Sequence, residues 1–227
     1  MSKLYSNFIS RRIIALTMRL TYHFDSKKDQ KICGCSLVKM EPAVYGGARG
    51  ETASAATRYW ALDKVFKGVS LNENDAFIDV GCGKGRILAY LIKKQYPCSI
   101  TGVEFGRELA EYAQAWTGRY DNITVINDDA FALDYNRYTV VFLARPFETE
   151  TFLKFRDYLE SHLTHKIQFI YVYDSSDGQY LDNRPGWTLL KRDRIFISHG
   201  LMMYRSPQRY SRWIYSPTAR ENNGQQG

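Results

Sequence analysis

Residues 77–88 read FIDVGCGKGRIL, and this stretch decides the fold. An apolar run that ends at Val80 meets glycines at three alternate positions, Gly81, Gly83 and Gly85, and a helix-compatible apolar run follows at once. Glycine lacks a Cβ, so the turn accepts positive φ and lets a ligand approach the backbone. The pattern predicts a buried strand, a tight turn and a helix start whose free N–H groups suit polar or anionic ligand groups.

The spacing of the glycines distinguishes this turn from two other nucleotide-binding turns. A phosphate-binding loop needs Gly-x4-Gly-Lys-Ser/Thr, which is absent here, and the dinucleotide fingerprint Gly-x-Gly-x-x-Gly needs its third glycine one residue later. What remains is Asp-x-Gly-x-Gly-x-Gly, with Asp79 two residues before the first glycine. A purely structural strand-to-helix turn is the alternative interpretation.

The composition is that of a soluble globular protein, because 44% of the 227 residues are hydrophobic and 24% are charged. No run of 18 apolar residues is present, so we expect no transmembrane segment. Arg11, Arg12 and Arg19 interrupt any signal-peptide core, so we expect a cytoplasmic location. The four cysteines (Cys33, Cys35, Cys82 and Cys98) lack metal-ligand spacing, so we expect reduced thiols and no metal site.

The net charge of +7 is concentrated near the N-terminus, where residues 1–50 hold nine Lys or Arg and three acids. Such a segment suits a nucleic acid, an anionic membrane or an acidic substrate, and equally a solvated helix face. We interpret residues 1–50 as a basic cap or lid, 51–215 as the main domain and 216–227 as a disordered tail.

Strand and helix patterns alternate along the main domain, which predicts a parallel, doubly wound α/β sheet. Residues 3–24 and 51–66 are expected to be helical and 25–50 irregular. The predicted strands are residues 76–80, 99–103, 123–127, 139–144 and 166–173. The predicted helices between them are residues 86–95, 107–120 and 148–163. Residues 187–197 and 201–205 flank Ser198-His199-Gly200 and predict a terminal β-hairpin with an antiparallel strand.

Two further acidic positions follow predicted strands. Glu104 lies 23 residues beyond Gly81, where an acid at the tip of the next strand can accept hydrogen bonds from ribose hydroxyls. A solvent-exposed acid before a helix is the alternative. Asp128 and Asp129 follow the third strand. Adjacent parallel strands end at one sheet edge, so these acids and the glycine turn are expected to face one ligand.

With three markers in order on three successive strand ends, residues 71–205 resemble the class I S-adenosylmethionine-dependent methyltransferases. The resemblance implies S-adenosyl-L-methionine as cofactor and a Rossmann-like sheet of seven strands, the last antiparallel, with helices on both faces. It also implies cofactor-binding roles. The glycine turn would pass under the methionine part, Asp79 would belong to its amino-group environment and Glu104 would hold the ribose. The remaining cofactor contacts would be Gly81, Cys82, Gly83, Gly85, Phe105, Asp128, Asp129 and Ala130.

The adenine end is implied in more detail. In the family, an acid accepts a hydrogen bond from the adenine amino group, and this position matches Asp129 or, alternatively, Asp128. A neighbouring backbone N–H recognises the adenine ring, and this position matches Ala130. Phe105 and Phe131 would sandwich the purine, or else belong to the ordinary core.

The stretch after the fourth strand departs from the family pattern. Many members read Asn-Pro-Phe there, whereas this chain has Arg145-Pro146-Phe147. A guanidinium only donates hydrogen bonds, so Arg145 argues against an amino-type acceptor and suits a carboxylate, a phosphate or another acidic group. Pairing of Arg145 with Glu148 or Glu150 is the alternative. We take Arg145 and Phe147 as candidate substrate contacts and Arg145 as a candidate catalytic residue.

Several further positions are expected near a methyl acceptor. A hydroxyl acceptor needs a base, for which His199, Tyr135 and Asp174 are candidates, Asp174 being best placed at a strand end. Residues 44–53 suit a lid with Tyr45 and Arg49 as substrate contacts. The basic and aromatic residues of 205–215 either stack nucleic-acid bases or cap a sheet edge.

These observations predict a methyltransferase whose acceptor carries an acidic group beside the nucleophile, most simply a small molecule. Three alternatives stay open. The chain could be a binding module without catalysis, a nucleotide-dependent oxidoreductase, or a nucleic-acid methyltransferase that binds its substrate through residues 1–50.

Overall fold

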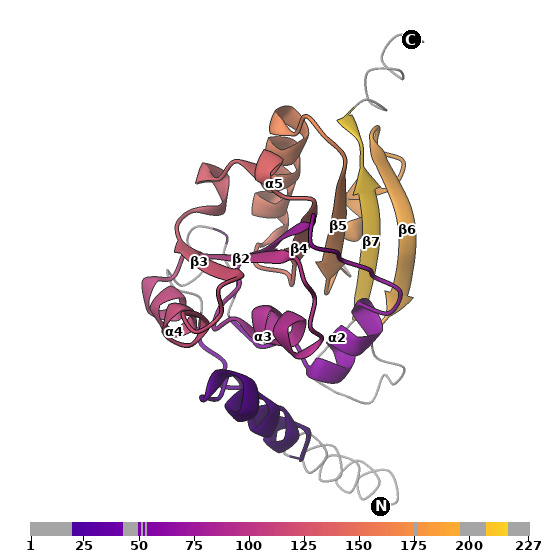
Figure 1. Ribbon diagram of the computed structural model, residues 1–227. Helices are drawn as coiled ribbons and strands as arrows, with labels where there is room; N and C mark the ends of the chain where they lie inside the picture. The colour runs from indigo at the N-terminus through magenta and orange to yellow at the C-terminus, as the bar shows by residue number, and fades with distance from the viewer. Residues whose placement is uncertain are drawn as a thin grey trace, which may run out of the picture.

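The structure is a computed structural model that describes residues 20–42, 50, 52, 54–174, 177–195 and 208–217. Seven strands form one sheet in the order β3-β2-β1-β4-β5-β7-β6 (Figure 1). Strands β1 to β5 pair in parallel, and β7 pairs antiparallel with both β5 and β6. The predicted doubly wound, mostly parallel sheet with an antiparallel hairpin is therefore confirmed.

The parallel half of the sheet follows the predicted alternation closely. Its strands are β1 (Ala76–Val80), β2 (Ser99–Glu104), β3 (Ile123–Asn127), β4 (Val140–Leu143) and β5 (Ile167–Val172). The helices that connect or precede them are α2 (Tyr59–Val65), α3 (Arg86–Lys93), α4 (Arg107–Thr117) and α5 (Thr149–His162). Short 3-10 helices are η1 (Ala130–Ala132), η2 (Tyr135–Arg137) and η3 (Gly178–Leu181). The first and third strands match their predicted bounds.

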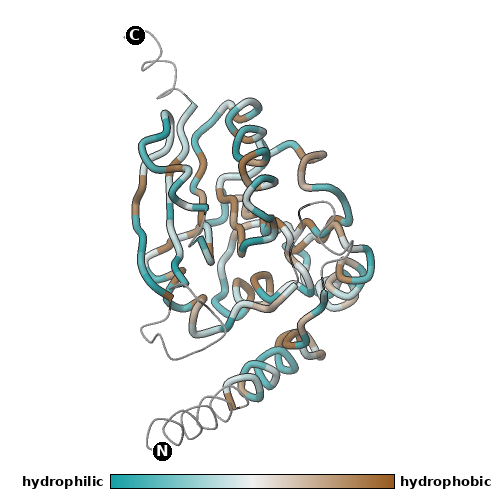
Figure 2. Tube along the Cα trace, turned by 180° about the vertical axis from the view of Figure 1, so that it is seen from behind, coloured by the Kyte–Doolittle hydropathy of each residue, from teal (hydrophilic) through white to brown (hydrophobic). Residues whose placement is uncertain are grey.

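Helices cover both faces of the sheet (Figure 1). One apolar cluster joins α2, α3 and α4 to residues such as Phe77 and Phe142. The other joins α5 to the alternate strand residues, such as Ile78 and Val141. Successive strand residues point to opposite faces, which explains why neighbours in one strand belong to different clusters. Hydrophobic residues accordingly concentrate along the central strands (Figure 2).

The N-terminal helix spans residues 20–33 among the described residues, so the expectation that 25–33 is irregular was wrong. Buried charges hold it in place. Asp29 is fully buried and accepts from Arg86 at 2.7 Å and from the Tyr59 hydroxyl at 2.9 Å. Asp25 accepts from Arg58 at 2.9 Å. A search for apolar periodicity misses a helix that is fixed by polar side chains.

The helix predicted over 51–66 is shorter than expected, because α2 begins only at Tyr59. Ser54 instead exchanges backbone hydrogen bonds of 2.9 Å with Glu41 in an isolated β-bridge. This tertiary pairing overrides the helix propensity of the alanines at 55 and 56.

The terminal hairpin consists of β6 (Trp187–Arg194) and β7 (Arg209–Tyr215). The predicted turn and the second strand predicted at 201–205 lie outside the described residues. Within the stretch interpreted as a base-stacking or edge-capping run, Tyr210, Trp213 and Tyr215 are buried. Because β7 lies between β5 and β6, neither interpretation holds for these aromatic rings, which belong to the core.

The described part of the chain lacks two further features. No helix there has the length and apolar character needed to span a lipid bilayer. Nor do three or more His, Cys, Asp or Glu side chains gather there as metal ligands would.

Breaking the buried ion pair should destabilise the protein. We expect Asp29→Ala to lower the free energy of unfolding by about 3–5 kcal/mol, because Arg86 would keep a buried charge with only Asp25, at 3.5 Å, left to pair with it. Urea denaturation measures the change. Glu150→Ala is the matched control, since it removes an exposed pair with Lys154 and should leave the midpoint nearly unchanged. Equal midpoints for the two variants would contradict the prediction.

Candidate functional site

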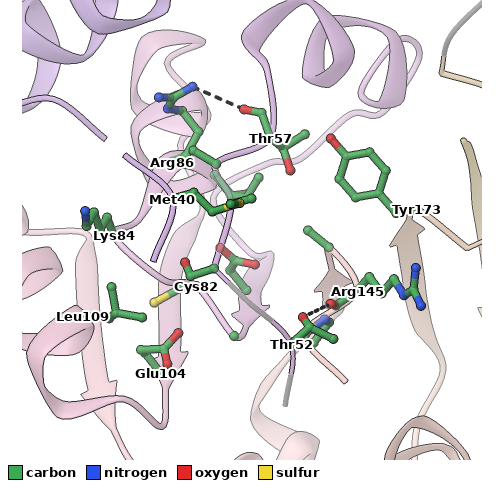
Figure 3. Close-up of a pocket in the computed structure, with 18 of the residues that line it drawn as sticks. Met40, Thr52, Thr57, Cys82, Lys84, Arg86, Glu104, Leu109, Arg145 and Tyr173 are labelled. Atoms are coloured by element: carbon green, nitrogen blue, oxygen red, sulfur yellow. Dashed lines mark hydrogen bonds between the residues drawn. The ribbon is translucent and has the colours of Figure 1, made fainter. Parts of the chain in front are cut away.

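A cavity of about 700 Å³ opens at the carboxyl ends of β1, β2 and β4 (Figure 3). Its floor is the glycine turn with Asp79, and its walls are the ends of β2 and β4 and residues 128–131. Described residues of the segment before α2 also line it. The three strand ends singled out in the sequence therefore meet around one cavity.

The glycine turn is closely packed at each glycine. Gly81, Gly83 and Gly85 have φ values of 72°, 54° and 87°. A Cβ on Gly81 would lie 2.4 Å from Pro146, one on Gly83 would lie 2.5 Å from the Ser54 hydroxyl, and one on Gly85 would lie 2.8 Å from Trp116. Of the predicted turn residues, Gly81 and Cys82 line the cavity, whereas Gly83 and Gly85 support it from behind.

Glu104 ends β2 beside this turn, as predicted. Its two carboxylate oxygens accept the backbone N–H groups of Gly83 and Gly106, both at 2.8 Å. Burial raises the pKa of Glu104, and these N–H groups oppose the rise. The carboxylate is therefore held at the cavity wall in a fixed orientation.

Asp79 is buried, with a relative exposure of 1%, and lines the cavity. Its Oδ2 has no hydrogen-bond partner among the described residues. Burial raises the pKa of Asp79 well above its usual value, and the nearby charge of Glu104 raises it further. An unpaired buried acceptor is costly, so this oxygen suits a ligand that donates hydrogen bonds or carries positive charge.

The third strand end contributes the predicted adenine wall. Asp128, Asp129, Ala130 and Phe131 all line the cavity, and so does Phe105 on the other side. Asp129 caps the short helix η1 by accepting from the Phe131 N–H at 3.0 Å.

A segment that precedes α2 runs along the cavity, and we call it the strap. It consists of residues 37–42, 50, 52 and 54–58. Glu41 pairs with Lys84 of the glycine turn at 2.7 Å, and Ser54 lies on Gly83. At the other end, the Thr52 hydroxyl donates to the Arg145 carbonyl at 2.7 Å and the Thr52 N–H donates to the Pro146 carbonyl at 3.1 Å. The strap thus contacts both the glycine turn and the loop after β4.

Arg145 and Phe147 line the cavity where the sequence predicted substrate contacts. The Arg145 side chain keeps 38% of its surface exposed, and its Nε is buried without a hydrogen bond among the described residues. Glu148, one of the two partners considered, is 4.0 Å away, beyond hydrogen-bond distance. In Figure 3 the guanidinium extends away from Thr52, which holds the backbone.

Two candidate bases lie outside the cavity. Asp174 is buried beyond the end of β5, 3.9 Å from Arg192 and 3.8 Å from Arg209, so its expected place beside the acceptor was wrong. Tyr135 is buried and donates to the Ala130 carbonyl at 3.0 Å. Tyr173, one position earlier and just after the end of β5, lines the cavity instead.

The predicted site residues and the residues that line the cavity differ at several positions. Tyr45, Arg49 and His199 lie outside the described residues. Thr52, Trp60, Tyr173 and Gln208 line the cavity but were not predicted. Tyr173 alone had a sequence signal, since it stands at a strand end on the predicted cofactor edge.

Comparison with known families now adds to this geometry. The model of a methyltransferase domain matches residues 77–161, which run from β1 into α5 and include the glycine turn, Glu104 and Asp129. Residues 77–161 thus form a methyltransferase domain, and the resemblance to the class I S-adenosylmethionine-dependent methyltransferases is confirmed. The cofactor of this family is S-adenosyl-L-methionine, and the residues described fit it, because the unpaired oxygen of Asp79 lies in the cavity.

Similar proteins include enzymes named for RNA substrates. An rRNA adenine N-6-methyltransferase of Lysinibacillus sphaericus is 27% identical over 146 residues, or 63% of this methyltransferase and 57% of that protein. A ribosomal RNA small subunit methyltransferase A of Alkaliphilus oremlandii is 30% identical over 76 residues, 34% of this chain and 26% of that one. The chain thus spans only part of the length of these relatives.

Solved structures share the fold. An RNA methyltransferase from Salinibacter ruber in complex with S-adenosyl-L-homocysteine has a TM-score of 0.53 at 19% identity and covers 71% of this chain and 94% of its own. A methyltransferase from Pyrococcus furiosus has a TM-score of 0.56 at 15% identity, with 88% and 98% covered.

Removal of the unpaired carboxylate should stabilise the ligand-free protein. The pKa of Asp79 is raised in the folded state, so the folded chain holds the proton more tightly than the unfolded chain, and stability is lost as pH rises. We expect Asp79→Asn to escape this loss and to be more stable than the wild type by on the order of 1 kcal/mol at pH 8. The gain should shrink toward pH 4. Urea denaturation at both pH values measures it, and a gain that grows on acidification would contradict the cause.

Proposed function

We propose that this methyltransferase transfers the methyl group of S-adenosyl-L-methionine to an acceptor that carries an acidic group beside its nucleophile. The observation that carries the cofactor assignment is the unpaired, buried Asp79 in the same cavity as the fixed carboxylate of Glu104. When bound, the cofactor supplies a methyl group on a positively charged sulfur.

In this proposal, each strand end holds one part of the cofactor. Asp79 takes the amino-group environment and the glycine turn, with Gly81 and Cys82, takes the methionine part. Glu104 takes the ribose hydroxyls. Asp129, with Asp128 as alternative, takes the adenine amino group, the Ala130 N–H reads the ring, and Phe105 contacts its face. Support comes from the presence of all these residues around one cavity.

The acceptor would lie between the loop after β4 and the strap. Arg145 supplies positive charge there, and Phe147 supplies an apolar wall. The described cavity residues near Arg145 include no histidine. A hydroxyl acceptor needs proton removal near the transition state, so this lining favours a nucleophile that attacks without prior deprotonation. Positioning of the acceptor is then the main contribution of the protein.

An RNA acceptor is the second candidate, and two observations favour it. The relatives described above are named for ribosomal RNA. The chain is also basic, and on the N-terminal helix Asp25 and Asp29 are engaged by arginines while Lys27 and Lys31 are exposed. RNA phosphates would also satisfy the acidic group that Arg145 suits.

Loss of Glu104 should weaken cofactor binding. We expect Glu104→Ala to raise the Kd for S-adenosyl-L-homocysteine by about 10- to 100-fold, because charge-assisted hydrogen bonds to the ribose would be lost. Isothermal titration calorimetry measures the Kd. Glu108→Ala, an exposed acid in the first turn of α4, is the control and should bind as the wild type does. An unchanged Kd in the Glu104 variant would remove the cofactor assignment, and tighter binding of NAD than of S-adenosyl-L-homocysteine would favour an oxidoreductase.

Turnover and salt dependence separate the remaining alternatives. With methyl-labelled cofactor, we expect label in total RNA or in a pool of small carboxylates and phosphate esters. If RNA is the acceptor, the logarithm of its Kd should rise with log salt with a slope of about 0.7 per neutralised phosphate. Tight cofactor binding without transfer to either pool would support a binding module without catalysis.

A further inference from the structure

Two neighbouring strands end on residues with an unusual backbone. Arg145 follows β4 with φ of 51°, and Tyr173 follows β5 with φ of 62°. Both residues line the same cavity, where the Tyr173 ring points toward Thr57 and the Arg145 guanidinium extends away from Thr52 (Figure 3). The left-handed region is unfavourable for side chains other than glycine, and strained non-glycine residues cluster at functional sites. Glycine would adopt this backbone at each position with less strain. The presence of Arg and Tyr instead is most simply explained if their side chains are required.

The backbone of Arg145 is fixed while its guanidinium is available. Thr52 engages the carbonyls of Arg145 and Pro146 through its hydroxyl and N–H. These carbonyls already accept hydrogen bonds from Thr52. The guanidinium lies 4.0 Å from Glu148, and its charge also acts on the buried hydroxyl of Tyr171, whose pKa it lowers against the larger effect of burial. This side of the cavity therefore offers donors and positive charge.

Tyr173 is held in a similar way. Its N–H donates to the Arg209 carbonyl at 2.8 Å, which pins the chain where β5 meets β7. Its half-buried ring packs against the apolar cluster on the α3 side, together with Ala144. A packed ring with a polar tip suits a ligand that is anionic at one end.

We propose that Arg145 and Tyr173 together form the acceptor subsite and bind an anionic group, either a carboxylate or a phosphate. The proposal rests on the proposed function, because it places this group beside the methyl acceptor. Both residues follow a strand with a left-handed backbone, and both line the cavity. The chain retains them at a cost in stability.

Anion binding to the protein saturated with S-adenosyl-L-homocysteine tests the proposal. The probes are inorganic phosphate, acetate and a short single-stranded RNA, and calorimetry or NMR titration gives each Kd. We expect the wild type to bind phosphate or acetate with a Kd in the millimolar range, Arg145→Gly to lose at least 10-fold and Tyr173→Phe to lose several-fold. Preference for RNA over both small anions identifies a nucleic-acid phosphate, and the reverse identifies a small acid.

Thermal unfolding supplies the second readout. We expect Arg145→Gly to raise the Tm by about 2–4 °C, which is the shift that relief of one strained residue gives in a chain of this size. Gln95→Gly is the matched control, because Gln95 also has positive φ, at 56°, but follows α3 away from the cavity. It should raise the Tm similarly and leave anion binding unchanged.

The outcomes separate this inference from the proposed function. One outcome is that S-adenosyl-L-homocysteine binds, while the Arg145 and Tyr173 variants bind the anions and the RNA as tightly as the wild type does. In that case the subsite proposal is wrong and the cofactor assignment stands. If S-adenosyl-L-homocysteine itself does not bind the wild type, the proposed function is wrong. A lower Tm for Arg145→Gly would overturn the argument from backbone strain.

Discussion

The structure depends on close packing around the glycine turn, where three separate elements occupy the space that side chains would need. Pro146 lies against Gly81, Ser54 lies against Gly83 and Trp116 lies against Gly85. The loop after β4, the strap and α4 are thereby positioned relative to β1. The absence of a Cβ serves packing as well as ligand approach, so these glycines are needed even before any ligand binds.

The buried carboxylates of this fold are of two kinds, paired and unpaired. Around Arg86 the carboxylates of Asp25 and Asp29 are paired, and this cluster attaches the N-terminal helix to the first residue of α3. In the cavity, Asp79 remains unpaired beside Glu104. A paired cluster specifies one arrangement of helices, whereas an unpaired carboxylate raises the energy of the ligand-free state. A bound cation or donor recovers that energy, which is how such a site gains affinity.

Local patterns predicted the sheet because β1 to β5 are short apolar runs bounded by glycine, proline and acids. Glu104 and Asp129 followed from the rule that parallel strands end at one edge. The predictions that were wrong concern segments whose structure depends on tertiary contacts between distant residues. The N-terminal helix is held by Arg86, 57 positions after Asp29, and residues 54–58 are kept from helix by a bridge to Glu41. The prediction for Asp174 failed by one residue, since the end of a strand cannot be located that finely from composition.

The strap connects the two halves of the proposed reaction. Glu41 and Ser54 contact the cofactor turn, while Thr52 contacts the loop that carries Arg145. A shift of the strap would therefore move both at once. Since Thr52 engages the two carbonyls after β4, the chain can keep the family's cofactor edge and still present a different surface to the acceptor. A strap fixed at both ends therefore lets the loop after β4 depart from the family pattern while the glycine turn and Glu104 keep their places.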